Sequence, residues 1–456
     1  MPALFAETAL LPQGWADRVR IDWDATGTIT SVTPGAPAPG TAERANTLLP
    51  GMPNLHCHSF QRAMAGLTER AGPAGDDFWG WRAVMYRFVA ALDPEQIAAI
   101  AAQLYVELLK AGYTAVAEFH YLHNDPAGKP YADRAELANQ IALAAGATGM
   151  RLTLLPVLYQ TGNFGGTPAS EAQRRFLLET DAFNALVESL FKALRGSRHV
   201  RIGIAPHSLR AVPPAALREA KAALDRIDAS APIHIHAAEQ TREVEDCLAW
   251  SKKRPVEWLL DEMKPDARWA LIHCTHMTPD ETRRLAASGA VAGLCPTTEA
   301  DLGDGLFPLV DYLAAQGRFG VGSDSNVGVS PAEELRWLEW GQRLARRKRN
   351  LVPAPEGRSI GAALWRDALA GGAQALGQPV GAIAPGCRAD FVALDRDHPS
   401  LAGHVGDGIL DALVFAGGSA AIRHVMVGGR WVVREGRHPA EERIAENYRA
   451  ALRRLA

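Results

Sequence analysis

The sequence predicts an α/β protein: a (β/α)8 barrel of the TIM type, joined to a small β-sandwich domain built from both termini. Two observations support this. Apolar strand-like runs alternate with helical patterns across residues 51–380, the order expected of a parallel sheet with crossover helices. Short alternating strand patterns, separated by turn residues, fill residues 1–50 and return in residues 381–456. We therefore expect the barrel in 51–380 and the small domain in the two flanking segments.

The terminal segments contain short strand patterns. Residues 19–23 and 27–32 alternate apolar and polar side chains, and residues 387–395 form another strand-like run. Residues 422–433 are typical of a hairpin that turns at two adjacent glycines. The chain ends in a basic amphipathic pattern at 440–455, which we expect to pack on the surface as a helix.

The central segment contains eight apolar strand candidates, the number that a closed barrel requires. They lie near residues 47–55, 113–119, 150–157, 200–205, 232–236, 269–273, 291–294 and 319–323. Two helix starts are well marked. Asp93-Pro94-Glu95-Gln96 predicts a capped helix through Lys110, and Ser330-Pro331-Ala332-Glu333 predicts a second one through Leu344.

Composition narrows the classes of function. The 456 residues are 47% hydrophobic and 22% charged, with a formal net charge of −3, so no global field favours nucleic acid or an anionic membrane. The five cysteines are scattered without a CxxC pair, which favours a reducing, cytoplasmic setting. No secretory signal pattern opens the chain, and no apolar run is long enough to span a membrane.

The most informative stretch is Leu55-His56-Cys57-His58-Ser59-Phe60. Two histidines two positions apart lie on the same face of an extended strand, so both imidazoles can reach one metal ion. Alone, the pair is more often two half-exposed strand histidines than a metal site. The interpretation therefore depends on whether other strands supply further ligands.

Three other predicted strands also end in polar groups. One ends at His236, with Glu239 three residues on, the next ends at His273, and the last ends at Asp324. Catalytic residues of a (β/α)8 barrel collect at the carboxyl ends of the strands. Each group alone might be structural, but four strand ends of this kind predict one shared site.

This ordered set, His-x-His, His-x-x-Glu, His and Ser-Asp, resembles the amidohydrolase superfamily, in its mononuclear deaminase-like branch. The longer string at residues 54–66, Asn-Leu-His-Cys-His-Ser-Phe-Gln-Arg-Ala-Met-Ala-Gly, resembles the formimidoylglutamate deiminase family of histidine breakdown. The resemblance implies one divalent metal ion, with Zn²⁺ first and Fe²⁺ next. Two-metal members carry a lysine on the fourth strand, and residues 201–206 contain none. The implied metal ligands are His56, His58, His236 and Asp324.

The same resemblance implies catalytic roles for Glu239, His273 and Asp324. Three neutral imidazoles leave a metal ion electrophilic enough for bound water to ionise near neutral pH. Asp324 would accept the proton of that water, and Glu239 would carry it to the leaving nitrogen. His273 would stabilise the charge that develops at the tetrahedral carbon or hold the nucleophile.

Substrate contacts are expected from residues near the strand ends. Arg210 follows the fourth strand and is suited to grip a carboxylate, although a surface arginine is the alternative. A dicarboxylate needs a second cation, for which Arg82 is the candidate. Gln61, Tyr121 and His207 match the deiminase pattern as polar contacts, although Tyr121 might instead be an ordinary buried tyrosine.

The expected reaction is hydrolytic deimination of N-formimidoyl-L-glutamate to N-formyl-L-glutamate and ammonia. Two alternatives stay open: a guanine deaminase-like enzyme that acts on a purine or pyrimidine ring, and a metal-binding regulatory protein that has lost catalysis. The expected partner is a small dicarboxylate, without nucleic acid or membrane. A homodimer is implied by the resemblance alone.

Overall fold

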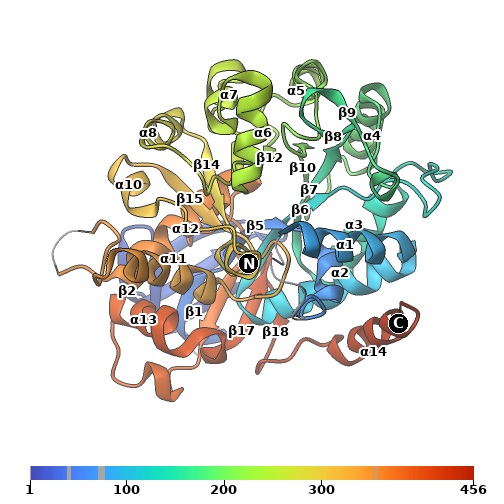
Figure 1. The fold of residues 1–456 in the computed structure, drawn as a ribbon. Coiled ribbons are helices and arrows are strands. Elements are labelled where there is room, and N and C mark those ends of the chain that lie inside the picture. The colour runs from blue at the N-terminus through green and yellow to red at the C-terminus, as the bar shows by residue number, and fades with distance from the viewer. Residues whose placement is uncertain (1, 39–42, 70–77, 355–356, 456) are drawn as a thin grey trace.

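The computed structural model describes residues 2–38, 43–69, 78–354 and 357–455. Within them, parallel strands follow one another around a closed barrel, in the order β5, β6, β7, β10 with β11, β12, β13, β14 and β15 (Figure 1). Isolated bridges close the two seams, Ile204 to Ile233 and Cys57 to Asp324. The strand bounds are β5 Met52–Cys57, β6 Tyr113–His120, β7 Arg151–Leu158, β10 Val200–Ile202, β11 Ala205–Pro206, β12 Ile233–Ala237, β13 Trp269–His273, β14 Val291–Leu294 and β15 Arg318–Val321.

The predicted barrel is confirmed, with two corrections to its strands. The run predicted at 47–55 is two strands, because β4 (Glu43–Pro50) belongs to the terminal sheet and β5 begins only at Met52. The run predicted at 200–205 is broken into β10 and β11, because Ile204 turns from β7 to form its bridge with Ile233 on the other side. Residues 269–273 and 291–294 form strands with the predicted bounds.

Helices surround the barrel (Figure 1). Their bounds are α1 Phe78–Ala91, α2 Pro94–Lys110, α3 Glu136–Thr148, α4 Thr180–Ala193, α5 Pro214–Ile227, α6 Thr241–Ser251, α7 Pro255–Glu262, α8 Pro279–Ser288, α9 Pro296–Asp301, α10 Leu309–Ala314, α11 Pro331–Arg346 and α12 Ile360–Leu376. The capping box that Asp93 and Gln96 predict for α2 is confirmed. The predicted start of α11 is confirmed, with Ser330 as the N-cap residue and Pro331 first in the helix, but the Ser330 side chain makes no capping hydrogen bond and the helix ends at Arg346 instead of Leu344.

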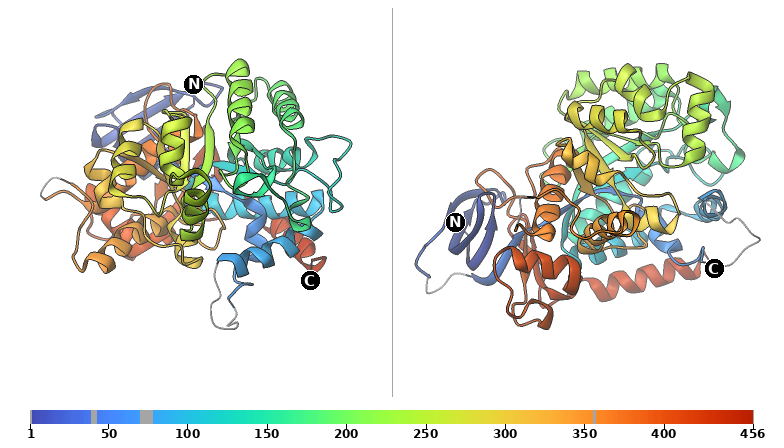
Figure 2. Two further views of the ribbon diagram at one scale, coloured as in Figure 1. Left: turned by 45° about the horizontal axis from the view of Figure 1, so that its top comes forward. Right: turned by 60° about the vertical axis from the view of Figure 1, so that its left-hand side comes forward.

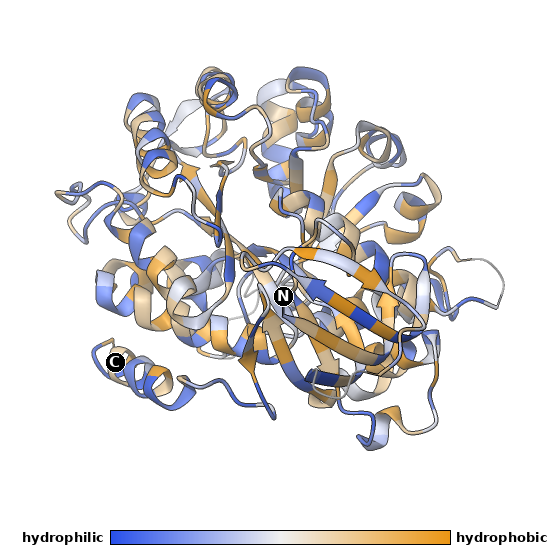
Figure 3. Cartoon of the chain, turned by 180° about the vertical axis from the view of Figure 1, so that it is seen from behind, coloured by the Kyte–Doolittle hydropathy of each residue, from blue (hydrophilic) through white to orange (hydrophobic). Residues whose placement is uncertain are grey.

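The two termini form one seven-stranded sheet in the order β18-β17-β16-β4-β1-β2-β3. The expected sandwich of two sheets is replaced by this continuous ladder, because β4 pairs with β1 on one side and with β16 on the other. Figure 3 shows this sheet in front, with apolar and polar residues alternating along its strands. The remaining bounds are β1 Ala3–Leu11, β2 Gly14–Trp23, β3 Ile29–Thr33, β16 Phe391–Leu394, β17 Ile422–Val427, β18 Arg430–Val433, α13 Asp407–Ala412 and α14 Glu441–Arg453.

The hairpin of β17 and β18 is confirmed, and α14 packs against α2 along the flank of the barrel (Figure 2). In the described part of the chain, no helix is long and apolar enough to cross a membrane.

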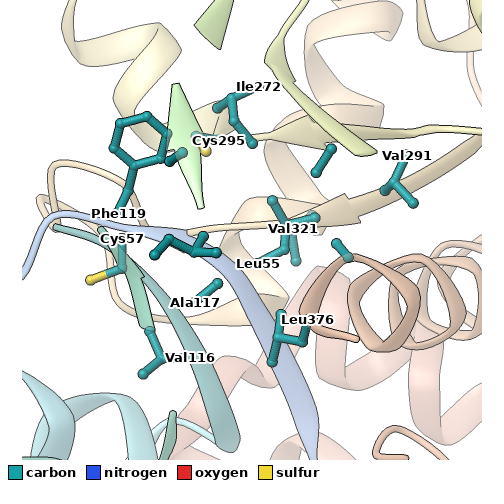
Figure 4. Packing of buried hydrophobic residues seen from close by; sticks show 14 of the residues in the cluster. Leu55, Cys57, Val116, Ala117, Phe119, Ile272, Val291, Cys295, Val321 and Leu376 are labelled. Atoms are coloured by element: carbon teal, nitrogen blue, oxygen red, sulfur yellow. The ribbon is translucent and has the colours of Figure 1, made fainter. Parts of the chain in front are cut away.

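Side chains fill the barrel interior below the strand ends. Leu55 on β5 is fully buried at its centre, and Figure 4 shows it among the side chains of the surrounding strands. Gly293 and Gly320 make room for it, because a Cβ at either position would lie 2.7 or 2.4 Å from a Leu55 methyl group. The interior is therefore a packed floor, and a ligand can enter only at the carboxyl ends of the strands.

Candidate metal centre and catalytic pocket

The polar strand ends converge at the mouth of the barrel. His56 Nε2 lies 3.2 Å from His236 Nε2 and 3.4 Å from Asp324 Oδ1, and His58 Nε2 also lies 3.4 Å from Asp324 Oδ1. All four side chains are buried. The bridge from Cys57 to Asp324 explains part of this convergence, because it sets the end of β5 beside the end of β15.

Backbone carbonyls fix the orientation of two of the three imidazoles. His58 Nδ1 lies 3.0 Å from the Phe119 carbonyl, and His236 Nδ1 lies 3.0 Å from the His207 carbonyl. Because a carbonyl oxygen only accepts, each Nδ1 carries the proton and each Nε2 presents its lone pair to the centre. Burial lowers the pKa of His56 to about 3, and it also holds the pKa values of His58 and His236 below their ordinary range.

This donor set fits a divalent metal ion. Neutral imidazoles and a carboxylate are its usual protein ligands. Donor atoms of His56, His58 and Asp324 lie within 4.8 Å of one another, and His56, His236 and His273 form a second group of this kind. Without a cation, the close Nε2 atoms of His56 and His236 would face each other inside a buried site. Burial would raise the pKa of Asp324, but the hydrogen bond with His56 and the neighbouring imidazoles of His56, His58 and His273 hold it far below its usual range.

Glu239 and His273 lie beside this centre. His273 Nε2 is 3.6 Å from Glu239 Oε1 and 3.7 Å from Asp324 Oδ2. Burial disfavours a charge on His273, but the surrounding carboxylates outweigh it and raise its pKa to about 10. Burial also raises the pKa of the Glu239 carboxyl above its ordinary value, despite the opposing charge of His273. The site thus pairs an imidazolium with a carboxyl group prone to hold a proton.

Strained backbone accompanies these strand ends. His273, Asp324 and Ala238 have φ values of 69°, 42° and 51°, a region that L-residues seldom occupy. Such conformations cost free energy and persist where the surroundings enforce them, often at functional sites. Here His273 is the last residue of β13, Ala238 directly follows β12, and Asp324 lies in the loop after β15.

A cavity opens over the centre, with about 550 Å³ of empty space including its mouth. All five predicted substrate contacts line it, and aromatic rings form much of the remaining wall. The lining residues are His58, Gln61, Phe78, Trp81, Arg82, Met85, Tyr86, Tyr121, Tyr159, Phe176, His207, Arg210, His236, Glu239, His273, Thr298, Leu302 and Asp324.

Arg210 is buried in the cavity wall and is not a surface arginine. Its guanidinium lies 3.8 Å from Glu239 Oε2 and 3.9 Å from Glu243 Oε2, and its Nε has no hydrogen-bond partner in the described part of the chain. A buried guanidinium with a free donor is ready to bind an anion that enters the cavity.

Arg82, Gln61 and Tyr121 are held mainly by other residues of the cavity wall. Arg82 on α1 donates to the Tyr159 hydroxyl at 3.3 Å and lies over the rings of Trp79 and Tyr86, at 5.3 and 5.1 Å. Gln61 donates to the Tyr121 hydroxyl at 3.1 Å. Tyr121 is therefore both a buried tyrosine with a bonded hydroxyl and a residue of the cavity wall.

Three buried residues at the site escaped the sequence analysis. Glu299 Oε1 lies 3.3 Å from His273 Nδ1, opposite the side that faces Glu239. Asp304 receives a hydrogen bond from Gln240, and burial with the nearby Glu239 raises its pKa to about 10. Tyr159 follows the end of β7 in the same way that Tyr121 follows β6, which is the signal that could have found it.

A buried cluster of three imidazoles and a carboxylate, with an acid–imidazolium pair at the mouth of a (β/α)8 barrel, defines a metal-dependent hydrolase. Comparison with known proteins agrees. Residues 47–432 match the amidohydrolase family, and residues 1–46 match the N-terminal domain of the formimidoylglutamate deiminase HutF. The chain therefore belongs to the amidohydrolase family, among the formimidoylglutamate deiminases.

Individual relatives give the same result. The formimidoylglutamate deiminase of Pseudomonas aeruginosa is 54% identical, and the match covers 98% of each chain. The 8-oxoguanine deaminase of the same organism is 30% identical over 86% of this chain and 83% of its own. The crystal structure of an amidohydrolase from Brucella melitensis superposes with a TM-score of 0.95, at 48% identity and with all of both chains covered.

Proposed function

We propose that this protein is a hydrolase that deiminates N-formimidoyl-L-glutamate to N-formyl-L-glutamate and ammonia, a step of histidine degradation. The observation that carries the proposal is the single cavity in which the imidazole–carboxylate centre lies beside the buried cation Arg210, with Arg82 on a second wall. The 54% identity to a formimidoylglutamate deiminase over 98% of both chains supports it.

Four side chains are proposed to hold one metal ion: His56, His58, His236 and Asp324. Imidazole-rich ligation suits zinc first and iron next. A bound ion of this kind would lower the pKa of water to near neutrality and so supply the nucleophile.

The proton steps are assigned to three residues of the chain. Asp324 accepts a proton from the attacking water, and Glu239 takes it on to the nitrogen that leaves as ammonia. Burial raises the pKa of the Glu239 carboxyl above its ordinary value, which makes its carboxylate a better acceptor for the proton from Asp324 before the proton passes to the more basic nitrogen. His273 as an imidazolium stabilises the negative charge that develops near Asp324 as the water oxygen adds to the formimidoyl carbon.

Substrate recognition is assigned to the cavity wall. Arg210 binds one carboxylate of the substrate, and Arg82 binds the other. Gln61, Tyr121 and His207 give polar contacts to the formimidoyl end. Charge is complementary as well as geometry, because a dianion offsets the two guanidinium groups in a largely aromatic pocket.

Ammonia release tests this function. Purified, metal-analysed protein is given formimidoylglutamate, guanine, cytosine and adenosine in parallel, and we expect release from formimidoylglutamate alone. The aromatic rings of Phe78, Trp81 and Phe176 could stack a purine, and the relative at 30% identity is an 8-oxoguanine deaminase. Release from a ring substrate alone would replace the proposed substrate and free both arginines from the carboxylate role.

Two further points belong to the proposal. A metal-binding regulatory protein without catalysis would give no ammonia from any substrate, and it would have no use for a buried proton-carrying Glu239.

All five cysteines are unpaired, which supports the cytoplasm as its location.

A further inference from the structure

A buried polar network lies between the first and last strands of the barrel, next to the metal centre. It consists of Asn54 on β5 together with Ser323 and Asn326 in the loop after β15, and all three residues are completely buried. Amide and hydroxyl groups cost free energy in such a place unless they are hydrogen-bonded. None of the reaction steps assigned above uses these three side chains, so their partners point to another task.

The Asn326 side chain ties the end of β5 to the loop after β15. Its Nδ2 donates to the His58 carbonyl and to the Asp324 carbonyl, each at 2.9 Å. Its Oδ1 accepts from Ser323 Oγ at 2.7 Å and from Cys57 Sγ at 3.5 Å. Because a carbonyl oxygen only accepts, the two carbonyls need the two N–H groups of an amide, and they fix its orientation.

Ser323 and Asn54 extend the same network into β5. Asn54 Nδ2 donates to Ser323 Oγ at 2.7 Å, and Asn54 Oδ1 accepts from Ser323 N at 3.2 Å and from His56 N at 3.3 Å. Ser323 Oγ therefore joins Asn54 to Asn326, because it accepts from one and donates to the other. Three of the four proposed metal ligands thus have a backbone atom bonded to one of the two asparagine side chains.

The backbone conformation of Asn326 suits this arrangement. Its φ of 62° lies in the left-handed region, which asparagine tolerates better than most residues. Next to it, backbone hydrogen bonds of 3.0 Å join His58 N to the Asp324 carbonyl and Asp324 N to the His56 carbonyl. The Asn326 amide therefore supports a short ladder from which three of the proposed ligands project.

Closure of the barrel does not by itself explain the network. At the other seam, Ile204 N donates to the Pro232 carbonyl and His234 N donates to the Ile204 carbonyl, each at 3.0 Å. That seam closes through backbone bonds beside the apolar side chains of Ile204 and Ile233. The seam with buried amides is the one from which metal ligands project, and partners behind the ligands are what orients them at a metal ion.

We propose that Asn326 is a positioning residue, which fixes His58 and Asp324 at the separation that a single metal ion needs, with Ser323 and Asn54 as its support. The inference rests on the proposed metal centre but not on the proposed substrate. Without the amide, the carbonyls of His58 and Asp324 lose the group that joins them, so the two ligands can move apart. Metal binding should then weaken in a subunit that stays folded.

The metal affinity of the full-length protein tests this role. Asn326→Gly removes the amide, and glycine keeps the positive φ without strain. We expect its dissociation constant for Zn²⁺, measured by competition with a chromophoric chelator, to rise by about 100-fold relative to the wild type. The visible absorption bands of Co²⁺ bound in its place should shift, because they report the geometry of the ligands.

Asn124→Gly is the matched control. Asn124 is also buried, and its Nδ2 donates to the carbonyls of Arg174 and Leu177, at 3.2 and 2.9 Å. These carbonyls belong to the segment before α4 and not to proposed metal ligands. The control should therefore lower the unfolding temperature of the metal-free protein, as Asn326→Gly does, but leave the Zn²⁺ dissociation constant and the Co²⁺ bands unchanged.

Ser323→Ala is a milder second variant, because it keeps Asn326 and removes only the hydroxyl that joins it to Asn54. Its Zn²⁺ dissociation constant should rise by about tenfold. Wild-type affinity in both Asn326→Gly and Ser323→Ala would overturn this inference alone, and so would an equal loss of affinity in Asn124→Gly. A wild type that binds no divalent ion would overturn the metal centre and the inference together. Failure of the proposed substrate appears only in the ammonia assay, since it does not alter these affinities.

Discussion

Two walls of the cavity are built in different ways. One wall consists of strand ends, from which His56, His236 and Asp324 project on a backbone held by the barrel ladder. The other is the α1 wall, formed by a helix inserted after β5, which presents Phe78, Trp81, Arg82 and Met85. On the strand-end wall, backbone carbonyls fix the imidazoles of His58 and His236, whereas Arg82 is held by ring faces and a single hydroxyl at 3.3 Å.

The difference between the two walls matches two tasks of the enzyme, with the reaction assigned to the strand-end wall and substrate recognition to the α1 wall. Proton transfer and metal binding need atoms held within fractions of an ångström, and a barrel rim supplies that rigidity. Gripping the far carboxylate of a substrate needs charge and some adaptability, which a helix outside the barrel can supply. We therefore expect changes in the strand-end wall to lower kcat and changes in the α1 wall to raise KM.

The largest effect is expected at Glu239. Glu239→Gln keeps the shape of the side chain but removes its transferable proton, so kcat should fall by about a thousandfold. KM and metal content should stay close to the wild-type values, because Glu239 is not a proposed ligand. Turnover and metal analysis of the same preparation check this. Near wild-type turnover in a metal-loaded Glu239→Gln protein would refute the assigned proton path.

Arg210 comes next, because it is buried on the strand-end side but is proposed to bind substrate. Arg210→Met should lower kcat/KM for formimidoylglutamate by about 100-fold, since a desolvated guanidinium–carboxylate pair is lost. Loss of packing is separated from loss of binding by a second substrate, a formimidoyl amine without carboxylates. The variant and the wild type should process that amine at similar rates. An equal loss on both substrates would mean that Arg210 acts by holding Glu239 and Glu243.

Arg82 sharpens the contrast between the two walls. Arg82→Met should raise KM by about tenfold with little change in kcat, because a partly exposed contact contributes less than a buried one. Arg87→Met, on an exposed position of the same helix, serves as the matched control and should leave both constants unchanged. A fall in kcat as large as that of Glu239→Gln would show that Arg82 takes part in the reaction itself, and the proposed division between the two walls would be wrong.

The last prediction concerns stability beneath the metal centre, outside both walls. Glu118 on β6 is buried and accepts hydrogen bonds from Ser59 N at 2.8 Å, Ser59 Oγ at 2.7 Å and the Tyr105 hydroxyl at 3.1 Å. Burial outweighs these bonds and raises its pKa from 4.5 to about 7. The folded state therefore favours the protonated carboxyl, and the stability it gives is lost as pH rises through about 7.

Glu118→Gln removes this titration. The free energy of unfolding of the wild type should drop by about 3 kcal/mol more than that of the variant between pH 4.5 and pH 8. Urea unfolding of metal-stripped protein at both values measures the difference and avoids the titration of metal binding. Identical pH profiles for the two proteins would show that Glu118 is ionised in the folded state throughout this range.

Much of the barrel could be predicted because strand patterns are local. Residues 269–273 and 291–294 are short apolar runs between clear turns, and they form β13 and β14 with those bounds. The run at 47–55 was misjudged because Gly51 alone separates two strands that pair with different sheets, and the turn signal of Pro50-Gly51 was passed over. The strand with which a segment pairs is decided by the tertiary fold, and the apolar–polar pattern of the segment itself does not indicate it.

The residues of the candidate site also fall into those that the sequence predicted and those that it missed. Polar groups at four strand ends predicted one shared site, and the structure places His56 Nε2 beside both His236 and Asp324, although the roles of these residues stay predictions. Glu299 and Asp304 were missed because they lie in α9 and the loop after it, whose path depends on packing. Their sequence context, acidic residues in a short helix, is also typical of a solvated surface.

Gly51 alone separates β4 of the terminal sheet from β5 of the barrel. A Cβ there would overlap the Thr114 side chain, since Thr114 Oγ1 would be 2.1 Å away, so the passage has no slack. The terminal sheet is thus joined to the strand that carries His56 by one closely packed residue, with no flexible linker between them. Removal of the segment before residue 50 should therefore disturb the strand that positions His56 and His58, even though all residues of the barrel remain.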